Sequence, residues 1–313
     1  MGPAQIAFMA LIIVLYTFQN FFCKKFSLTY NGESSDTTPV LTIIGGVIVV
    51  GVTFLFSGCV FSAQLLTVIF GVVNAVALYF YNDFLLKASV SGPYSVLIVF
   101  SVFGGISLPA LVKLIGFGDK MSGPALCFLV IIMVSVYLIS VKPTDENEAV
   151  TNKISLKFIL YCVGLFFCNG SYASILALQQ ELTGEAEKEE LIMVTFAVAA
   201  IFSFIALIAG KSNLKSVFSM SKGAFANLLI YALSAAFAIN SLVIILLLEV
   251  NTGVLLAVQN AGVMLVSVIF SMIFFREKLT RVNAVGCTLM AIGLVGITVF
   301  EKISFSQIIN YIA

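Results

Sequence analysis

The sequence predicts an all-α protein that crosses a membrane ten times, and three observations lead to this prediction. Of its 313 residues, 61% are hydrophobic and only 10% are charged, whereas a soluble protein carries about 25% charged residues. The mean hydropathy is +1.14. The apolar residues also gather into ten runs, each near the length of roughly 20 residues that a transmembrane helix needs.

Charged or turn-rich segments separate the ten runs. In chain order the runs cover residues 4–27, 38–57, 62–86, 90–113, 122–141, 154–180, 190–210, 223–248, 252–275 and 280–299. The first run lacks the basic segment of a cleaved signal peptide, so we expect it to remain as a helix. The runs that begin at 62 and 154 are long enough to tilt or to extend past the bilayer.

Lys and Arg residues are distributed unequally between the two sides that alternate along a ten-helix chain. Four of the 16 fall on the side of the N-terminus and 12 on the other side. Because the basic side of a membrane protein is normally cytoplasmic, we expect both termini to lie outside. The acidic loop "QELTGEAEKEE" would then also lie outside. We expect an integral protein of a bacterial plasma membrane.

Several kinds of catalytic chemistry are disfavoured. The chain has no His, and its six Cys residues form no CxxC pair, so a zinc or haem site is not expected. The phosphate-binding pattern GxxxxGK[ST] and the pattern GxSxG are both missing from the sequence. A Ser-His-Asp triad needs His. We therefore expect no catalytic residues, metal or cofactor, and a protein that is not an enzyme.

A weak internal repeat relates the two halves of the chain. Gly116 to Ser140 resembles Ile273 to Thr298. The alignment sets Asp119 on Glu277, Lys120 on Lys278, Met121 on Leu279 and Ser122 on Thr280. It predicts a first five-helix unit at 1–141, a connecting loop at 142–153, a second unit at 154–300 and a tail at 301–313. Five is odd, so the second unit enters the membrane from the opposite side, which is an inverted repeat typical of secondary transporters.

Ser122 and Thr280 each stand at the start of a helix that closes a unit, and both are candidate N-caps. The acidic–Lys pairs beside them fit either a capping turn at the membrane interface or an ion pair that takes part in gating.

The closing segment "FFREKLTRVNAVGCTLMAIGLVGI" resembles the EamA-type branch of the drug/metabolite transporter superfamily. The matching residues are Glu277, Leu279, Thr280, Gly286 and Gly293, with a degraded copy at Asp119, Met121 and Ser122. This resemblance implies ten helices in two inverted units around a central site. Many relatives carry Pro in the ninth helix, near the "VQNAG" of this chain, so their substrate preferences do not carry over.

Polar residues inside the apolar runs are the candidate solute ligands, because such residues normally face the bundle interior or a cavity. They concentrate in runs 1, 3, 4, 6, 8 and 9, whereas runs 2, 5 and 10 are nearly all apolar. The candidates are Tyr16, Gln19, Asn20, Asn74, Tyr79, Tyr94, Asn169, Ser171, Tyr172, Asn240, Gln259 and Asn260. The alternative for each is a hydrogen bond between helices with no role in binding. Neighbouring helical residues point about 100° apart, so we expect at least one of Gln259 and Asn260 to face the cavity.

The expected function is alternating-access transport of a small polar or zwitterionic metabolite, such as an amino acid. No Asp, Glu, Lys or Arg lies at the centre of a run, which disfavours proton-coupled export of organic cations. A sugar, nucleotide-sugar or organic-cation carrier of the same fold, or a non-transporting scaffold or flippase subunit, are the alternatives. The expected partners are a small-molecule solute and the lipid bilayer, with no nucleic acid, and the expected state is a monomer or weak homodimer.

Overall fold

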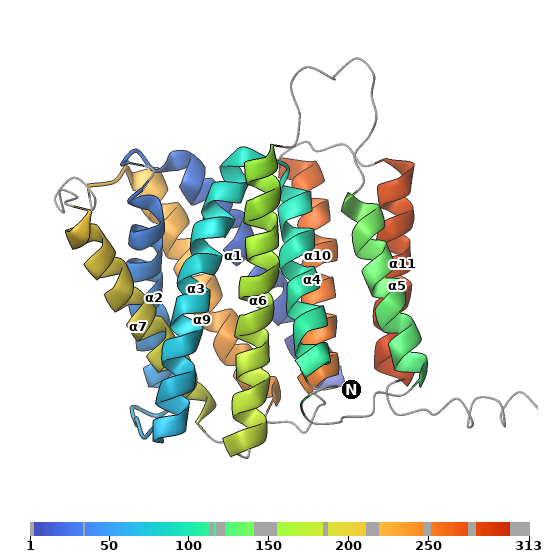
Figure 1. Ribbon diagram of the computed structural model, residues 1–313, viewed down its shortest axis with the longest axis horizontal. Helices are drawn as coiled ribbons and strands as arrows, with labels where there is room; N and C mark the ends of the chain where they lie inside the picture. The colour runs from blue at the N-terminus through green and yellow to red at the C-terminus, as the bar shows by residue number, and fades with distance from the viewer. Residues whose placement is uncertain are drawn as a thin grey trace, which may run out of the picture.

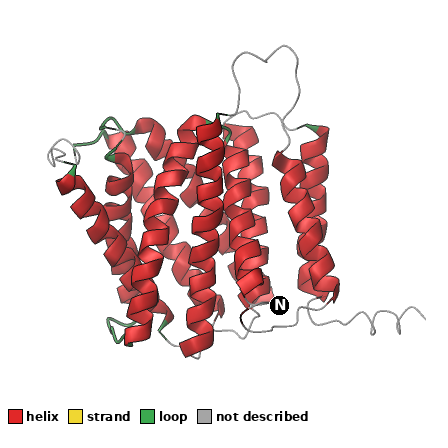
Figure 2. Ribbon diagram, in the orientation of Figure 1, coloured by secondary structure: helices red, strands yellow, loops and turns green. Residues whose placement is uncertain are grey.

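A computed structural model describes residues 3–33, 35–112, 116, 123–140, 155–183, 187–210, 219–246, 252–274 and 280–300. These residues form ten α-helices joined by loops, with no strand among them (Figures 1 and 2). The helices are α1 (Pro3–Thr29), α2 (Thr37–Phe56), α3 (Leu65–Ser91), α4 (Tyr94–Val112), α5 (Gly123–Ser140), α6 (Leu156–Thr183), α7 (Lys188–Ala209), α9 (Lys222–Leu246), α10 (Thr252–Phe274) and α11 (Arg281–Phe300).

Each of the ten expected runs coincides with one helix to within a few residues. Six segments are long and apolar enough to cross a membrane by length and composition: Ile6–Thr29, Thr37–Phe56, Leu65–Ser91, Leu156–Gln179, Lys188–Ala209 and Lys222–Ile245. Large apolar side chains such as Val47, Leu55 and Ile205 are more than half exposed. Such a surface suits lipid better than water, and the chain is a polytopic membrane protein. The expected connecting loop 142–153 and tail 301–313 lie outside the described residues.

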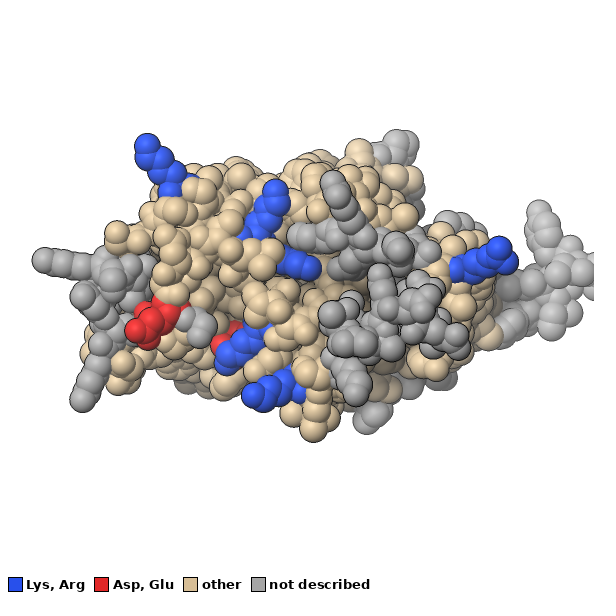
Figure 3. All heavy atoms as spheres, turned by 90° about the horizontal axis from the view of Figure 1, so that it is seen from above, with Lys and Arg blue, Asp and Glu red and all other residues tan. Residues whose placement is uncertain are grey.

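The helices run alternately up and down the bundle. The last residues of α1 and α3 therefore lie at the same end of the molecule as the first residues of α6 and α9 (Figure 1). The side chain of Asn227, at the start of α9, donates to Thr29 Oγ1 at the end of α1 over 3.1 Å. Of the described Lys and Arg residues, Lys188 lies at the opposite end, and the rest lie at this one: Lys24, Lys25, Lys87, Lys157, Lys222 and Arg281. We call this the basic end. Seen from above, it carries scattered Lys and Arg side chains and few acidic ones (Figure 3).

Helices from the two halves of the chain are interleaved rather than separated. α1 packs mainly on α9, α4 on α6, and α2 on α7. α5 and α11 pack on each other at one edge of the bundle, where they touch the rest mainly through α4 and α10 (Figure 1). The remaining helices therefore enclose the centre of the molecule, and this outer pair does not reach it.

Glycines permit a close helix crossing between α4 and α6. A Cβ added at Gly104 would lie 1.9 Å from the backbone oxygen of Phe166. A Cβ at Gly170 would lie 2.7 Å from the backbone oxygen of Gly104. Two facing glycines let the backbones approach, and such contact replaces hydrophobic burial as a source of helix association in lipid. The crossing holds α6, from the second half, against α4, from the first.

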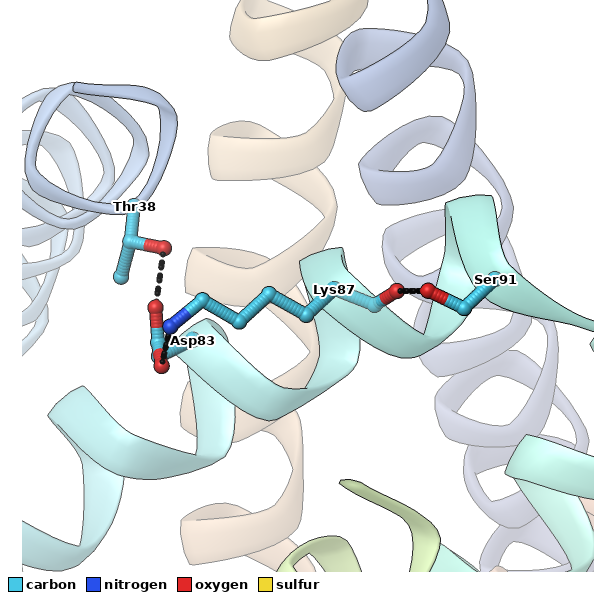
Figure 4. Close-up of polar contacts among 4 residues, drawn as sticks. All are labelled: Thr38, Asp83, Lys87 and Ser91. Atoms are coloured by element: carbon cyan, nitrogen blue, oxygen red, sulfur yellow. Dashed lines mark hydrogen bonds and ion pairs between the residues drawn. The ribbon is translucent and has the colours of Figure 1, made fainter. Parts of the chain in front are cut away.

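Side-chain hydrogen bonds and an ion pair stabilise the ends of the helices. At the basic end, Asp83 accepts a hydrogen bond from Thr38 over 3.0 Å and pairs with Lys87 at 2.6 Å (Figure 4). At the other end, Glu187 accepts bonds from the backbone amide of Gln64 (3.0 Å) and the hydroxyl of Thr67 (2.6 Å). The Glu187 carboxylate thus caps the start of α3 and ties it to the start of α7.

The capping role expected for Thr280 is confirmed. The backbone amide of Asn283 donates to Thr280 Oγ1 over 3.1 Å, and the amide of Thr280 donates to Asn283 Oδ1 over 2.9 Å. This reciprocal pair satisfies free amides at the start of α11. Ser122, the corresponding residue of the first half, lies outside the described residues.

The α4–α6 crossing predicts a strong effect of Gly104→Ala. The added methyl group would collide with the backbone of α6 and force the helices apart, which typically costs about 1–3 kcal/mol. We expect a clearly lower unfolding temperature for the detergent-solubilised variant. The matched control is Gly51→Ala on α2, where a Cβ meets nothing within 4 Å. Equal unfolding temperatures for the two variants would contradict the crossing.

Candidate functional site

A cavity lies among α1, α3, α4, α6, α9 and α10, with one contribution from α7. Water-sized groups can occupy about 100 Å³ of it, whereas a single water needs only about 10–15 Å³ on this measure. Its lining residues on α1, α3, α6 and α10 come from the middle of each helix. The cavity is therefore central in the bundle and large enough for a small solute.

Helical spacing gathers the polar lining of α1. Tyr16, Gln19 and Asn20 are separated by three and four residues, which places them on one face of the helix. Gln259 and Asn260 on α10 both line the cavity, although they are neighbours in sequence. The cavity therefore extends far enough around α10 for both Gln259 and Asn260 to line it, although their side chains point in different directions.

Asn169 and Asn260 meet over a glycine of α4. A Cβ at Gly105 would lie 2.7 Å from Asn169 Nδ2 and 3.0 Å from Asn260 Oδ1. Asn169 Nδ2 donates to the backbone oxygen of Ser101 over 2.8 Å. The missing side chain at Gly105 thus makes room for two amides, one from α6 and one from α10.

Aromatic rings provide much of the remaining wall. Tyr16, Tyr81, Tyr172 and Phe196 all line the cavity. The hydroxyl of Ser101 donates to that of Tyr81 over 3.5 Å. An apolar part of a solute would pack on these rings, while the tyrosine hydroxyls and amides offer hydrogen bonds at its edges.

Some buried amides in the cavity lack protein partners among the described residues. Gln259 is 7% exposed and Asn20 is 8% exposed, yet neither side chain bonds another described residue. The Gln19 Oε1 atom is also buried and unbonded there. An unpaired buried polar group costs about 1–3 kcal/mol, so the Gln19 Oε1 atom needs water or a solute to complete its bonding.

None of the described residues that line the cavity is Asp, Glu, Lys or Arg. Nor do the described residues contain a group of three or more His, Cys, Asp or Glu side chains that could hold a metal ion. The arrangement can form hydrogen bonds to a polar solute and pack against its apolar part.

An apolar cluster borders the cavity on the side away from the basic end. It consists of Met9, Ile12, Ala173, Leu242, Ile245 and Leu255, and we call it the floor. Ile12 precedes the cavity residue Tyr16 by one helical turn, and Leu255 precedes Gln259 by one turn. The floor joins α1 to α6, α9 and α10, so helices of both halves would have to separate to open it.

The structure brings seven of the twelve sequence-predicted residues to the cavity: Tyr16, Gln19, Asn20, Asn169, Tyr172, Gln259 and Asn260. Both amides of the "VQNAG" stretch are among them. Their arrangement agrees with the expectation that helices in positions 1, 3, 4, 6, 8 and 9 enclose the centre.

The other five predicted residues lie elsewhere. Asn240 donates to Thr53 Oγ1 (2.9 Å) and to the Ala236 oxygen (2.8 Å), so it ties α9 to α2. Ser171 is exposed on the outer side of α6, and Tyr79 packs edge-on against Phe80. Asn74 is 2% exposed and lies one turn beyond the cavity residue Leu78. Tyr94 is fully buried one turn beyond the cavity residue Ile98, towards the basic end.

Sequence reasoning missed Tyr81, Ser101 and Phe196 in the lining. Helical spacing could have found Tyr81 in place of Tyr79, because Tyr81 follows Leu78 by three residues and shares its face. Ser101 carried no signal as a lone serine in an apolar run. Phe196 is one of 29 Phe residues, and nothing in its neighbourhood separates it from the others.

No family model matches the chain, and no curated protein matches its sequence. Among solved structures, a protein known from a crystal structure is similar to it with a TM-score of 0.67. That protein is 12% identical, and the match covers 96% of this chain and 99% of the other. Identity at this level shows a shared fold over the full length of both chains.

Substitutions of two buried amides, one hydrogen-bonded between helices and one without a described partner, distinguish a structural role from a binding role. Asn240→Leu removes a bond between helices and strands the Thr53 hydroxyl, so we expect a loss of about 1–3 kcal/mol in unfolding free energy. Gln259→Met removes an amide without a described partner, so we expect unchanged or higher stability. Thermal unfolding in detergent without added solute measures both. A loss for Gln259→Met as large as that for Asn240→Leu would show that Gln259 supports the fold.

Proposed function

We propose that the chain is a secondary transporter that moves a small polar or zwitterionic metabolite by alternating access. The observation that carries the proposal is the central cavity, which holds the buried amides Gln259 and Asn20, without described partners, and the unbonded Oε1 atom of Gln19. A scaffold would gain stability by replacing such groups with apolar ones. Their retention in a hydrocarbon environment is explained by a polar solute that passes through.

The packing of the helices supports the proposal that two inverted five-helix units are the parts that move during transport. Set the first five helices on the last five in order. The α1–α9 contact then becomes α6–α3, the α4–α6 contact becomes α10–α1, and the α3–α7 contact becomes α9–α2, all of which occur. The α2–α7, α4–α10 and α5–α11 contacts each map onto themselves. This pattern is expected of two units related by an axis in the membrane plane, and it favours the resemblance to the EamA-type transporters.

The distribution of charge favours one orientation. Lys and Arg residues concentrate at the basic end, which we propose is cytoplasmic. The N-terminus and the end of α11 lie at the opposite end (Figure 1), so both termini would be outside the cell. The start of α7, with Glu187, Glu189 and Glu190, would face outside as well.

One observation favours a second substrate class. Four aromatic rings line the cavity, and the faces of Tyr rings attract organic cations. An organic cation is therefore the rival of a polar or zwitterionic solute, and a transport assay must include both.

Transport by purified protein in liposomes tests the proposal. We expect uptake of at least one member of a panel of amino acids, other polar metabolites and organic cations. Gln259→Ala and Asn260→Ala should each reduce that uptake about tenfold, as loss of about 1.4 kcal/mol of binding would do. Ser171→Ala, on the exposed face of α6, is the control and should transport normally. Absence of uptake across the panel, or full activity of both amide variants, would refute the proposal.

A further inference from the structure

A second, smaller hollow lies behind one wall of the central cavity, and we call it the side hollow. It is so narrow that no water-sized group fits inside. Residues of α2, α3, α7 and α9 line it: Leu41, Thr42, Gly45, Gly46, Val49, Asn82, Phe196, Tyr231 and Ala235. Phe196 and Ala235 also line the central cavity. These two residues therefore form the wall between the two spaces.

The two wall residues differ greatly in size. Phe196 is 8% exposed and Ala235 is 4% exposed. Both belong to an apolar cluster that also contains Val49, Leu78 and Ile239. Ala235 contributes only a methyl group, so the Phe196 ring is the larger part of the wall. Removal of the ring would leave little between the central cavity and the side hollow.

The side hollow suits an apolar group better than a polar one. Gly45 and Gly46 leave α2 without side chains there, and a Cβ at Gly45 would lie 3.2 Å from Cε1 of the Tyr231 ring. The polar side chains of the hollow bond each other. Asn82 Nδ2 donates to Thr42 Oγ1 over 3.2 Å, and the Tyr231 hydroxyl donates to Asn82 Oδ1 over 3.4 Å. A polar group that entered the hollow would have to displace these bonds, whereas an apolar group would not.

The central cavity carries amides on the side opposite this wall. Gln259 and Asn260 lie on α10, whereas Phe196 lies on α7. The two helices stand apart in the bundle, because α7 packs on α2 and α10 packs on α4 (Figure 1). A solute whose polar group bonds the amides of α10 therefore extends its apolar part across the cavity towards Phe196.

We propose that Phe196 sets the length of the apolar part of the solute by closing the side hollow to it. A short apolar chain packs on the ring. A longer chain has room only where the ring no longer separates the hollow from the cavity. The inference rests on the proposed function and narrows its substrate to polar solutes with a short apolar part.

Compounds of graded length test the inference. The probes are straight-chain 2-amino acids with alkyl side chains of one to six carbons, and alkyltrimethylammonium ions of the same lengths cover the organic-cation rival. Each competes with the solute that the liposome panel identifies. For wild-type protein we expect affinity to fall at least about tenfold from the short to the long members. Phe196→Ala should bind the long members about tenfold more tightly than wild-type protein and the shortest equally well. An unchanged length profile, or binding of neither series, would overturn the inference.

Two further variants locate the added room. Phe158 is a buried ring that is not among the described lining residues of either space, so Phe158→Ala is the matched control and should keep the wild-type profile. Gly45→Ala, added to Phe196→Ala, places a methyl group in the side hollow and should cancel the gain for the longest members. A gain that survives this second change would overturn the assignment of the side hollow.

The outcomes separate the inference from the proposed function. Removal of a buried ring is destabilising, so if Phe196→Ala does not fold, Phe196→Leu takes its place and should give a smaller gain of the same sign. If wild-type protein moves no member of the panel, the proposed function fails. If it transports a solute and its length profile does not depend on residue 196, the inference alone fails.

Discussion

Hydrocarbon cannot form hydrogen bonds, and this constraint shapes the molecule from its secondary structure to its cavity. It requires the backbone to satisfy itself within each segment, which leaves helices as the form of every described spanning element. It also requires polar side chains to find partners inside the bundle. Asn240 does so with Thr53, and Asn82 does so with Thr42 and Tyr231. Against this background, amides such as Gln259 and Asn20, without described partners, stand apart from the residues that hold helices together.

Close approach of backbones places these amides around a shared space. Gly104 and Gly170 bring α4 against α6, and Gly105, next to Gly104, leaves room for the side chains of Asn169 and Asn260. A Cβ at Gly262 of α10 would lie 2.4 Å from Ile13 of α1, so this pair also approaches closely. The outer pair α5 and α11 uses glycines in another way. Gly293 and Gly296 seat against Ile132 and Phe128 of α5, which joins the two helices to each other at the edge.

The sequence was sufficient for the helices, because a run of about 20 apolar residues has one stable arrangement in a bilayer. It was sufficient for part of the cavity, because an amide inside such a run must face inward. It was not sufficient to choose which inward space an amide faces. Asn240 lies one residue from the cavity residue Ile239, and that rotation of about 100° turns it to α2. The prediction for Ser171 fails for a related reason. Its neighbours Asn169 and Tyr172 lie on the face of α6 that lines the cavity, and Ser171 lies on the outer face. The sequence also did not predict that Lys24 is only 8% exposed, since a lysine near a helix end is ordinarily an interfacial residue.

The same constraint is met differently on the two sides of the cavity. The floor is an apolar cluster between α1 and helices α6, α9 and α10. Opening it exposes apolar surface, a loss that scales with area and has no preferred direction. The layer on the side of the basic end is polar: Tyr231 of α9 bonds Asn82 of α3, Asn82 bonds Thr42 of α2, and Lys24 of α1 lies over the Tyr94 ring of α4. Opening it breaks polar contacts, but it also admits water to groups that water satisfies well. The cavity is therefore bordered by apolar packing on one side and by directional polar contacts on the other, so a change in the packing of the helices would have different consequences on the two sides.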